Sequence, residues 1–343
     1  MSRYDLTRAE VGSLLADLPR FRSDQLWDGL YRQLAEPAEI AVLPRPVRDR
    51  LASAPELAPA LRVERLVTAD SGLTEKWLLR LADDARVETV LMHHPRHSTV
   101  CVSSQAGCAM ACSFCATGQG GFRRHLGVGE IVEQVVLASR ASRTRGRRLD
   151  NVVLMGMGEP LANYSNVLSA IRRLVADLGI GARHVTVSTV GIAPAIRRLA
   201  SEDLQVNLAV SLHGANDGLR ASLVPIARRY PLAQLVAACE HYGRETGRRI
   251  SLEWALIDGV NDRASDASEL AAIARRLRAH VNLIPLNPTP GYLATGTSPQ
   301  GVRAFRDQLT TFGVNVTVRR TRGRDIDAAC GQLAASPGAP TAT

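Results

Sequence analysis

The sequence contains almost no lysine and few aromatic side chains. Lys76 is the only lysine among 42 basic residues, and aromatic residues make up 4% of the chain. So few rings argue against a surface built to stack many bases. The formal charge of +9 still favours a polyanionic partner such as nucleic acid, although so one-sided a use of arginine can also come from a GC-rich genome.

Long hydrophobic runs are also missing. No apolar run approaches the roughly 18 residues that a membrane helix needs, and the first residues mix charged and apolar positions instead of forming a signal-type segment. We therefore expect a cytoplasmic protein with no membrane partner. In that reducing compartment the six cysteines are expected to be ligands or catalysts rather than a disulfide framework.

The hydrophobic periodicity divides the chain into regions. Residues 1–60 show the apolar spacing of short helices, and residues 61–93 show short alternating runs between turn signals, which predict a small β-meander linker. Over residues 94–333 apolar strands alternate with amphipathic helices, whereas residues 334–343 are small and polar and are predicted to form a disordered tail.

The third region sets the expected fold class. Its predicted strands are residues 152–155, 184–189, 206–212, 250–256, 281–286 and 314–318. Repeated strand–helix units predict an α/β fold with a parallel sheet, either open or curled into a full or partial barrel. In both arrangements the active site lies at the carboxyl ends of the strands.

A cluster of three cysteines follows the first core strand. Cys108, Cys112 and Cys115 form a C-x3-C-x2-C pattern in GCAMACSFCATG. Thiolates are the ligands of iron–sulfur clusters, and three ligands to four irons leave one iron open. An open iron can chelate the amino and carboxylate groups of S-adenosylmethionine (SAM) and deliver an electron that releases a 5′-deoxyadenosyl radical. The alternative is a zinc site, for which His125 is the nearest fourth ligand.

Several stretches carry a resemblance to one family. They are FRSDQLWDGLY, CVSSQAGCAMACSFCATG, MGMGEPLANY, VTVSTVGI, LAVSLHGANDGLR, NLIPLNP and VRRTRGRDIDAACGQL. From about Phe21 to Leu333 the chain resembles the radical SAM superfamily and, within it, the dual-specificity RNA adenine C2 methyltransferases (RlmN). The resemblance implies a partial (β/α)6 radical SAM barrel behind a small N-terminal helical domain. It also implies a 4Fe-4S cluster and two molecules of SAM per turnover.

The implied activity is methylation of carbon 2 of an adenine in 23S rRNA and of an adenine beside the anticodon of tRNA. By resemblance, one SAM methylates Cys330, and a second provides the radical that removes a hydrogen from that methyl group. The methylene radical adds to carbon 2, and Cys101 is the thiol that attacks the thioether, so that a disulfide bond is expected in the cycle. Glu88 is carried over as the base for the carbon 2 proton, and Cys101 as a thiolate is the alternative.

The resemblance also implies the SAM-binding residues. Gly158 and Glu159 match positions at the amino group of methionine, and glycine there lets the backbone approach a ligand closely. The other matches lie at strand ends, where a barrel places its ligands: Ser188, Ser211, Leu212, His213 and Asn287.

Without the resemblance, several of these residues would be interpreted as structural. Cys101 lies on an apolar strand edge, where buried free cysteine is common. Glu88 would lie on the solvent face of a strand, and a lone His213 would be a hydrogen-bonded core residue. Cys239, in an amphipathic segment, is expected in the core.

Two groups of arginines are candidates for RNA contacts. The first lies near Cys330 and is well placed to hold phosphates beside the reacting base, whereas the second could equally be a solvated loop. The first comprises Arg319, Arg320, Arg322 and Arg324, and the second comprises Arg143, Arg145, Arg147 and Arg148. The further partner that the resemblance implies is a small electron donor such as flavodoxin or ferredoxin, and a monomer is expected.

Two other functions stay open at this point. The related antibiotic-resistance (Cfr) enzymes share both thiols and the cluster and methylate carbon 8 of the same rRNA adenine. A protein of another class, a zinc-containing RNA-binding module without catalysis, would use the cysteine loop as a structural site.

Overall fold

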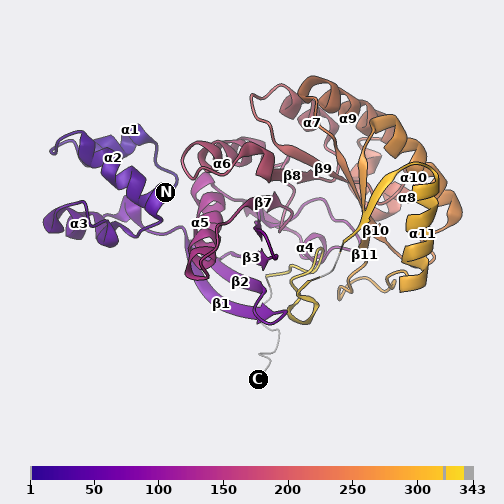
Figure 1. Ribbon diagram of the computed structural model, residues 1–343, viewed down its shortest axis with the longest axis horizontal. Coiled ribbons are helices and arrows are strands. Elements are labelled where there is room, and N and C mark those ends of the chain that lie inside the picture. Colours follow the sequence, from indigo (N-terminus) through magenta and orange to yellow (C-terminus); the bar gives the residue numbers. More distant parts are fainter. Residues whose placement is uncertain (1, 320–321, 336–343) are drawn as a thin grey trace.

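The N-terminal region is helical, as expected. The computed structural model describes residues 2–319 and 322–335. Its first helices are α1 (Arg8–Leu14), α2 (Phe21–Asp28) and α3 (Arg45–Ala52), with short turns at Gly29–Gln33, Pro37–Glu39 and Pro55–Leu57. Thr7 caps α1, because its hydroxyl accepts a hydrogen bond from the Glu10 N–H at 3.2 Å. Figure 1 shows these helices as a separate group at one side of the molecule.

The predicted β-meander is part of the main sheet rather than a separate linker. Strands β1 (Leu61–Ala69), β2 (Thr74–Leu81), β3 (Arg86–His93) and β4 (Ser98–Cys101) pair antiparallel in chain order. β4 then pairs in parallel with β7 (Asn151–Leu154), so the meander extends the parallel sheet on one side. The full order is β1-β2-β3-β4-β7-β8-β9-β10-β11-β12.

The parallel strands form the curved core of the molecule. After β7 they are β8 (Val185–Thr189), β9 (Asn207–Ser211), β10 (Ser251–Leu256), β11 (His280–Pro285) and β12 (Asn315–Val318). Their buried residues are mainly β-branched and aliphatic, and in β7, β8 and β11 they alternate with partly exposed residues, as in a sheet with one face packed against helices. This arrangement confirms the α/β barrel type of fold, and β12 continues the parallel run beyond β11.

Helices cover the outside of this sheet (Figure 1). They are α5 (Val128–Thr144), α6 (Tyr164–Ala176), α7 (Ala193–Ala200), α8 (Asp217–Leu223), α9 (Leu232–Thr246), α10 (Ala264–Leu277) and α11 (Pro299–Thr311). Short elements complete the fold: β5 (Gln105–Gly107), α4 (Ala116–Gln119), β6 (Phe122–His125) and 3-10 turns at Ala182–His184, Pro225–Arg228 and Arg324–Ile326. The concave side is left for the site.

The second arginine group binds the chain's own acceptors. Arg143, near the end of α5, donates hydrogen bonds of 2.9 and 2.8 Å to the carbonyl oxygens of Gln33 and Arg32 in the N-terminal region. The group therefore joins parts of the fold, and Arg143 in particular holds the N-terminal region to α5. The other contacts are Arg145 with the Glu75 carboxylate (2.9 Å), Arg147 with the His94 carbonyl (2.6 Å) and Arg148 with the Gly179 carbonyl (3.0 Å).

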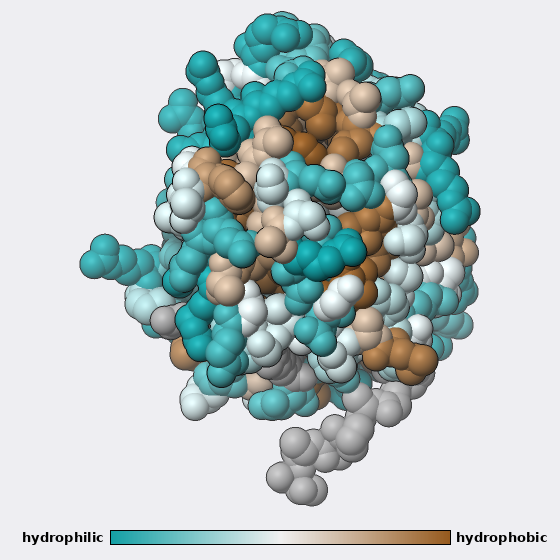
Figure 2. Space-filling model, turned by 90° about the vertical axis from the view of Figure 1, so that its right-hand side faces the viewer, coloured by the Kyte–Doolittle hydropathy of each residue, from teal (hydrophilic) through white to brown (hydrophobic). Residues whose placement is uncertain are grey.

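Polar residues dominate the side of the molecule that carries the later helices. In Figure 2, which views the right-hand side of Figure 1, hydrophobic residues are visible mainly between hydrophilic ones near the centre of the face. Among residues 2–319 and 322–335, no helix combines the length and the apolar character that a transmembrane segment requires.

Candidate active site

A cavity lies at the carboxyl ends of the parallel strands, and we call it the strand-end cavity. It brings together most of the residues that the sequence singled out, although they come from distant parts of the chain. Its lining includes Cys112, Cys115, Gly158, Glu159, Ser188, Ser211, His213, Asn287, Arg319 and Cys330. This is the edge at which a barrel of parallel strands places its ligands.

The three cysteines lie on a loop that is closed by a small hairpin. β5 and β6 pair antiparallel on either side of the loop, and the Cys108 N–H donates to the Gly121 carbonyl oxygen at 2.7 Å. Gly107 has a φ of +75°, and a Cβ there would lie 2.0 Å from the same carbonyl oxygen. The closure therefore requires glycine at position 107, and it holds the loop beside the cavity.

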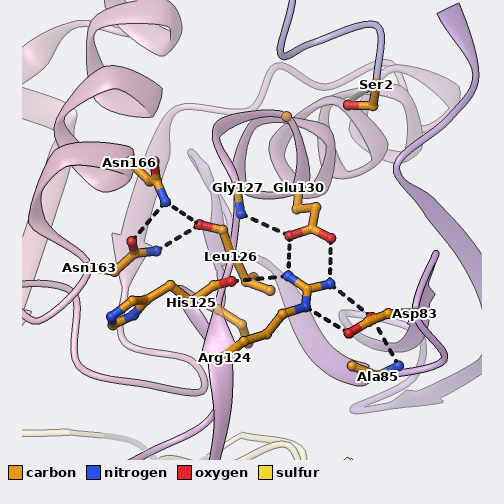
Figure 3. Close-up of polar contacts among 12 residues, drawn as sticks. Ser2, Asp83, Ala85, Arg124, His125, Leu126, Gly127, Glu130, Asn163 and Asn166 are labelled. Carbon is orange, nitrogen blue, oxygen red and sulfur yellow. Dashed lines mark hydrogen bonds and ion pairs between the residues drawn. The ribbon is translucent and has the colours of Figure 1, made fainter. Parts of the chain in front are cut away.

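Arg124 anchors this hairpin to its surroundings (Figure 3). Its guanidinium donates to both carboxylate oxygens of Asp83, at 2.8 and 2.9 Å, in the turn between β2 and β3. It also donates to both oxygens of Glu130, at 2.8 Å each, in the first turn of α5. These charge-assisted bonds hold the pKa of the Asp83 carboxyl well below its usual value. The meander, the cysteine loop and α5 are thus joined at one side chain.

The thiols of the cysteine loop are free and are buried or partly buried. Within the described ranges 2–319 and 322–335, no group of three His, Cys, Asp or Glu side chains that could hold a metal ion is found. Burial raises the pKa of the Cys108 thiol to about 12 and also raises that of Cys112. Iron must therefore displace their protons on binding.

Gly158 and Glu159 form one wall of the strand-end cavity. Gly158 has a φ of +100°, and a Cβ there would lie 2.5 Å from the Gln105 Cβ. The Glu159 carboxylate accepts hydrogen bonds from the backbone N–H groups of Leu161 (3.0 Å) and Val190 (2.8 Å). Its burial raises the carboxyl pKa to about 7. A carboxyl in such a place is poised to become charged when a cation such as the SAM ammonium binds beside it.

The His213 side chain lines the strand-end cavity, whereas the side chain of its neighbour Leu212 does not. The His213 ring lines the cavity and its Nδ1 accepts from the Ala255 N–H at 2.9 Å. Burial lowers its pKa to about 3, so the ring is neutral. The Leu212 side chain is buried and does not line the cavity, and its backbone N–H donates to the Glu253 carbonyl at 3.0 Å. Leu212 therefore does not join the other predicted SAM-binding residues in the lining of the strand-end cavity.

Cys101 and Cys330 face a common space. Cys101 ends β4, and Cys330 lies on the segment after β12, but both line a second, adjoining cavity together with Met155, Asn287 and Arg319. All six cysteines are free, so the expected disulfide bond is absent from this structure. Burial raises the pKa of the Cys101 thiol to about 12, and the Arg319 cation opposes that effect. Cys239 is in the core, as expected.

The described members of the first arginine group make different contacts. Arg319 lines both cavities and lies close to the thiols instead of on an outer RNA-binding surface. Arg322 donates to the His93 carbonyl oxygen at 2.7 Å. Arg320 and the side chain of Arg324 lie outside the described residues.

Glu88 is buried, whereas the strand pattern alone suggested a solvent face. Its side chain is 3% exposed and lies 3.1 Å from the ammonium of Lys76. It lines neither the strand-end cavity nor the adjoining one. No local pattern indicates a role for Lys76, although it is the only lysine in the chain.

Comparison with known proteins identifies the superfamily of the chain. The radical SAM superfamily model matches residues 102–271, which include the cysteine loop and the Gly158–Glu159 wall. A solved radical SAM methyltransferase from Sphaerobacter thermophilus is 50% identical, with a TM-score of 0.94, and the match covers 98% of this chain and 100% of that one. The chain is a radical SAM enzyme, a methyltransferase by this likeness.

Curated relatives identify the particular family. A probable dual-specificity RNA methyltransferase RlmN of Frankia casuarinae is 52% identical over 97% of this chain and 82% of its own length. Dual-specificity RNA methyltransferase RlmN 1 of Myxococcus xanthus is 49% identical over 97% of this chain and 94% of its own length. The chain belongs to the RlmN family of RNA methyltransferases. These names favour neither a zinc-containing RNA-binding module nor the carbon 8 enzymes.

Proposed function

We propose that this protein methylates carbon 2 of an adenine in 23S rRNA, and of the adenine beside the anticodon of tRNA, through a methyl group carried on Cys330. The observation that carries the proposal is the common space shared by Cys330 and Cys101 next to the strand-end cavity. The names of the relatives, which describe dual-specificity RNA methyltransferases, support the choice of substrate. We further propose a cytoplasmic monomer that takes electrons from a flavodoxin- or ferredoxin-type protein.

The residues present fit the cofactors of this reaction. Cys108, Cys112 and Cys115 would hold a 4Fe-4S cluster, which when bound supplies the electron that cleaves SAM. Glu159 would face the SAM ammonium, and the buried Oδ1 of Asn287, which has no partner among the described residues, offers an acceptor to the same ligand. Ser188, Ser211 and His213 would complete the wall.

Cys330 acts first as a nucleophile. Its sulfur takes the methyl group of one SAM by displacement and gives up its proton. Arg319, a cation, lines the same space as the Cys330 sulfur. A second SAM, when bound, would supply the radical that removes a hydrogen atom from the S-methyl group, so that the methylene carbon on Cys330 can bond to carbon 2 of the adenine.

Cys101 is the residue that we propose for release. The adduct gives up an electron to a one-electron acceptor, a role that the oxidised iron–sulfur cluster would supply. The Cys101 thiolate lines the cavity with Cys330 and is therefore better placed than Glu88 to take the carbon 2 proton, which it passes on to water. The Cys101 thiolate then attacks the Cys330 sulfur. A sulfur–sulfur bond forms as the bond from sulfur to the methylene carbon breaks. The methylene carbon keeps the electron pair of that bond and takes up a proton to become the methyl group, and a dithiol reductant reopens the disulfide.

The proposal is tested by comparing Cys330→Ala with Cys101→Ala. Reconstituted enzyme is incubated anaerobically with SAM, reductant and labelled RNA, and the products are run on a denaturing gel. Cys101→Ala should remain covalently joined to RNA, because nothing attacks its thioether. Cys330→Ala should form no adduct, because it lacks the methyl carrier. Normal turnover by Cys101→Ala would show that another group resolves the adduct.

The position of the methyl group needs its own measurement. Mass spectrometry of digested rRNA and tRNA should place the new methyl group on carbon 2 of the adenine in each. A methyl group on carbon 8 would contradict the proposal.

A further inference from the structure

The segment that carries Cys330 crosses the open side of the sheet. We call residues 322–335 the carrier arm. In Figure 1 the chain leaves β12 and runs back to lie beside β1, β2 and β3. At the cavity it is held by α4, since the Ala116 N–H donates to the Gly331 carbonyl at 2.8 Å and the Thr117 hydroxyl donates to the Leu333 carbonyl at 2.5 Å.

A buried ion pair lies beneath the arm. Lys76 on β2 and Glu88 on β3 are diagonal neighbours across the hairpin, because Glu88 lies opposite Leu78, and their side chains are 5% and 3% exposed. The Lys76 ammonium donates to the Asp327 carbonyl oxygen at 3.2 Å. The Glu88 carboxylate accepts from the backbone N–H groups of Ala334 at 2.9 Å and Ala335 at 3.3 Å. The pair therefore bonds the arm before and after Cys330.

The energetics couple this pair to the position of the arm. Two buried charges lose their hydration, and their mutual attraction offsets that loss only when their remaining hydrogen-bonding groups are also satisfied. Here those further partners are backbone groups of the arm. If the arm moved away, Glu88 would lose two donors and Lys76 would lose an acceptor. The buried ion pair is therefore stable while the arm is in place and supplies these hydrogen bonds.

The choice of lysine agrees with this geometry. Every other basic residue of the chain is arginine, a planar group with a fork of five donors. An ammonium is a compact point charge, and at this site it has to reach one carboxylate and one carbonyl oxygen in a space that is closed to water. A guanidinium would bring more donors than the described neighbours satisfy.

We propose that Lys76 and Glu88 are positioning residues that clasp the carrier arm and thereby place the Cys330 sulfur at the strand-end cavity. Glu88 in this assignment holds the arm and is not the base for the carbon 2 proton. The function of the clasp rests on the proposed role of Cys330 as methyl carrier, whereas its effect on the arm can be measured without that role.

The test compares Lys76→Met and Glu88→Gln with the wild-type protein. Each protein is reconstituted anaerobically and treated with iodoacetamide, and alkylation of Cys330 is followed by peptide mass spectrometry. Each substitution leaves the other member of the pair as a buried charge without its partner, and this loss of stability should open the arm measurably. We therefore expect alkylation of Cys330 to be about tenfold faster or more in both variants. Cys239, which is buried in the core, should react equally slowly in all proteins.

A matched control separates arm opening from general instability. Glu75 lies on β2 next to Lys76 and pairs with Arg145 at 2.9 Å, with a side chain that is 8% exposed. Among the described residues it makes no hydrogen bond to the arm. Glu75→Gln should therefore lower the midpoint of thermal unfolding without speeding the alkylation of Cys330.

Lys76 also provides a direct probe of the clasp. It carries the only lysine ε-amine of the chain, so acetylation by an N-hydroxysuccinimide ester at an internal residue reports this one site. The acetylation of Lys76 should be slow in the wild type. It should be about tenfold faster or more in Glu88→Gln, since loss of the ion pair with Glu88 exposes the amine. The same rate in both proteins would overturn the proposal.

Three outcomes distinguish the clasp from the proposed function. If folded Lys76→Met and Glu88→Gln alkylate Cys330 at the wild-type rate, the clasp is wrong whatever the enzyme does. If wild-type Cys330 is never methylated by SAM while the alkylation rates rise as expected, the clasp stands and the carrier role fails. If Glu88→Gln keeps the wild-type alkylation rate and methylates Cys330 but yields no methylated RNA, Glu88 acts on the RNA and the clasp is overturned.

Discussion

The side-chain amide of Asn287 donates a hydrogen bond to the carbonyl oxygen of Cys330 over 3.1 Å. The other end of the same side chain, Oδ1, is buried without a partner among the described residues, and Asn287 lines both cavities. One residue thus contacts Cys330, the proposed methyl carrier, through its donor and offers its acceptor to the proposed SAM site.

We predict that Asn287→Ala weakens SAM binding and also slows the methylation of Cys330. Loss of one net hydrogen bond of about 1 kcal/mol should reduce SAM affinity roughly fivefold, and methylation of Cys330 should slow because the carrier arm loses a contact. Equilibrium dialysis gives the affinity, and mass spectrometry gives the methylated cysteine. Asn207→Ala is the control, because Asn207 begins β9 at the end away from the cavity. Unchanged SAM binding in Asn287→Ala would contradict the assignment.

The cysteine loop should bind a redox-active cluster. Anaerobically reconstituted protein should be brown, and replacing Cys108, Cys112 or Cys115 with Ala should abolish cluster iron and SAM cleavage, since each thiolate holds one iron. Cys239→Ala should retain both. Iron content and the visible spectrum report the result. Wild-type amounts of cluster in the three loop variants, or a colourless protein that holds zinc, would refute the prediction.

Glu159 should make the cluster-free protein less stable as the pH rises. Burial raises its pKa from 4.5 to about 7, so between these values the folded state keeps a proton that the unfolded state releases. The contribution of this group to stability is therefore greatest below pH 4.5 and is lost above pH 7, by an amount of about 3 kcal/mol at most.

Glu159→Gln removes this titration and should be more stable than the wild type at pH 8 but not at pH 4. Urea unfolding at both pH values measures the difference. Glu240→Gln is a suitable control, because a hydrogen bond from Arg276 lowers the pKa of Glu240 and its contribution has the opposite sign. If the free energies of unfolding of Glu159→Gln and the wild type differ by the same amount at both pH values, Glu159 does not titrate between them.

Arg143 should hold the N-terminal helices rather than RNA. Arg143→Ala loses the two hydrogen bonds to the carbonyls of Gln33 and Arg32, so we expect a loss of about 1 kcal/mol in the free energy of unfolding and faster proteolysis of the helical region. The dependence of RNA affinity on salt should not change. Exposed Arg96 provides the control. A log–log salt slope that falls by about one unit in Arg143→Ala would show a phosphate contact instead.

Local sequence patterns predicted much of the fold. The apolar runs at residues 152–155 and 184–189, for example, became β7 (Asn151–Leu154) and β8 (Val185–Thr189), because alternation and β-branched composition act within a single segment. The spacing of Cys108, Cys112 and Cys115 on one loop is likewise a property of consecutive residues. Burial of Glu88 was not predictable in this way, because its cover comes from the far end of the chain.

Three features follow from the sequence by itself: the helical start, the alternation of strands and helices, and the three-thiol loop. Each depends on residues that are close along the chain, where backbone propensity and periodicity operate. The tertiary structure alone decided that Cys101 and Cys330 share a space, that Arg143 binds carbonyls, and that Lys76 pairs with Glu88 beneath the carrier arm. These contacts join segments that are distant along the chain. They depend on the packing of the whole sheet and on the need to satisfy every buried charge, and neither can be predicted from a local sequence pattern.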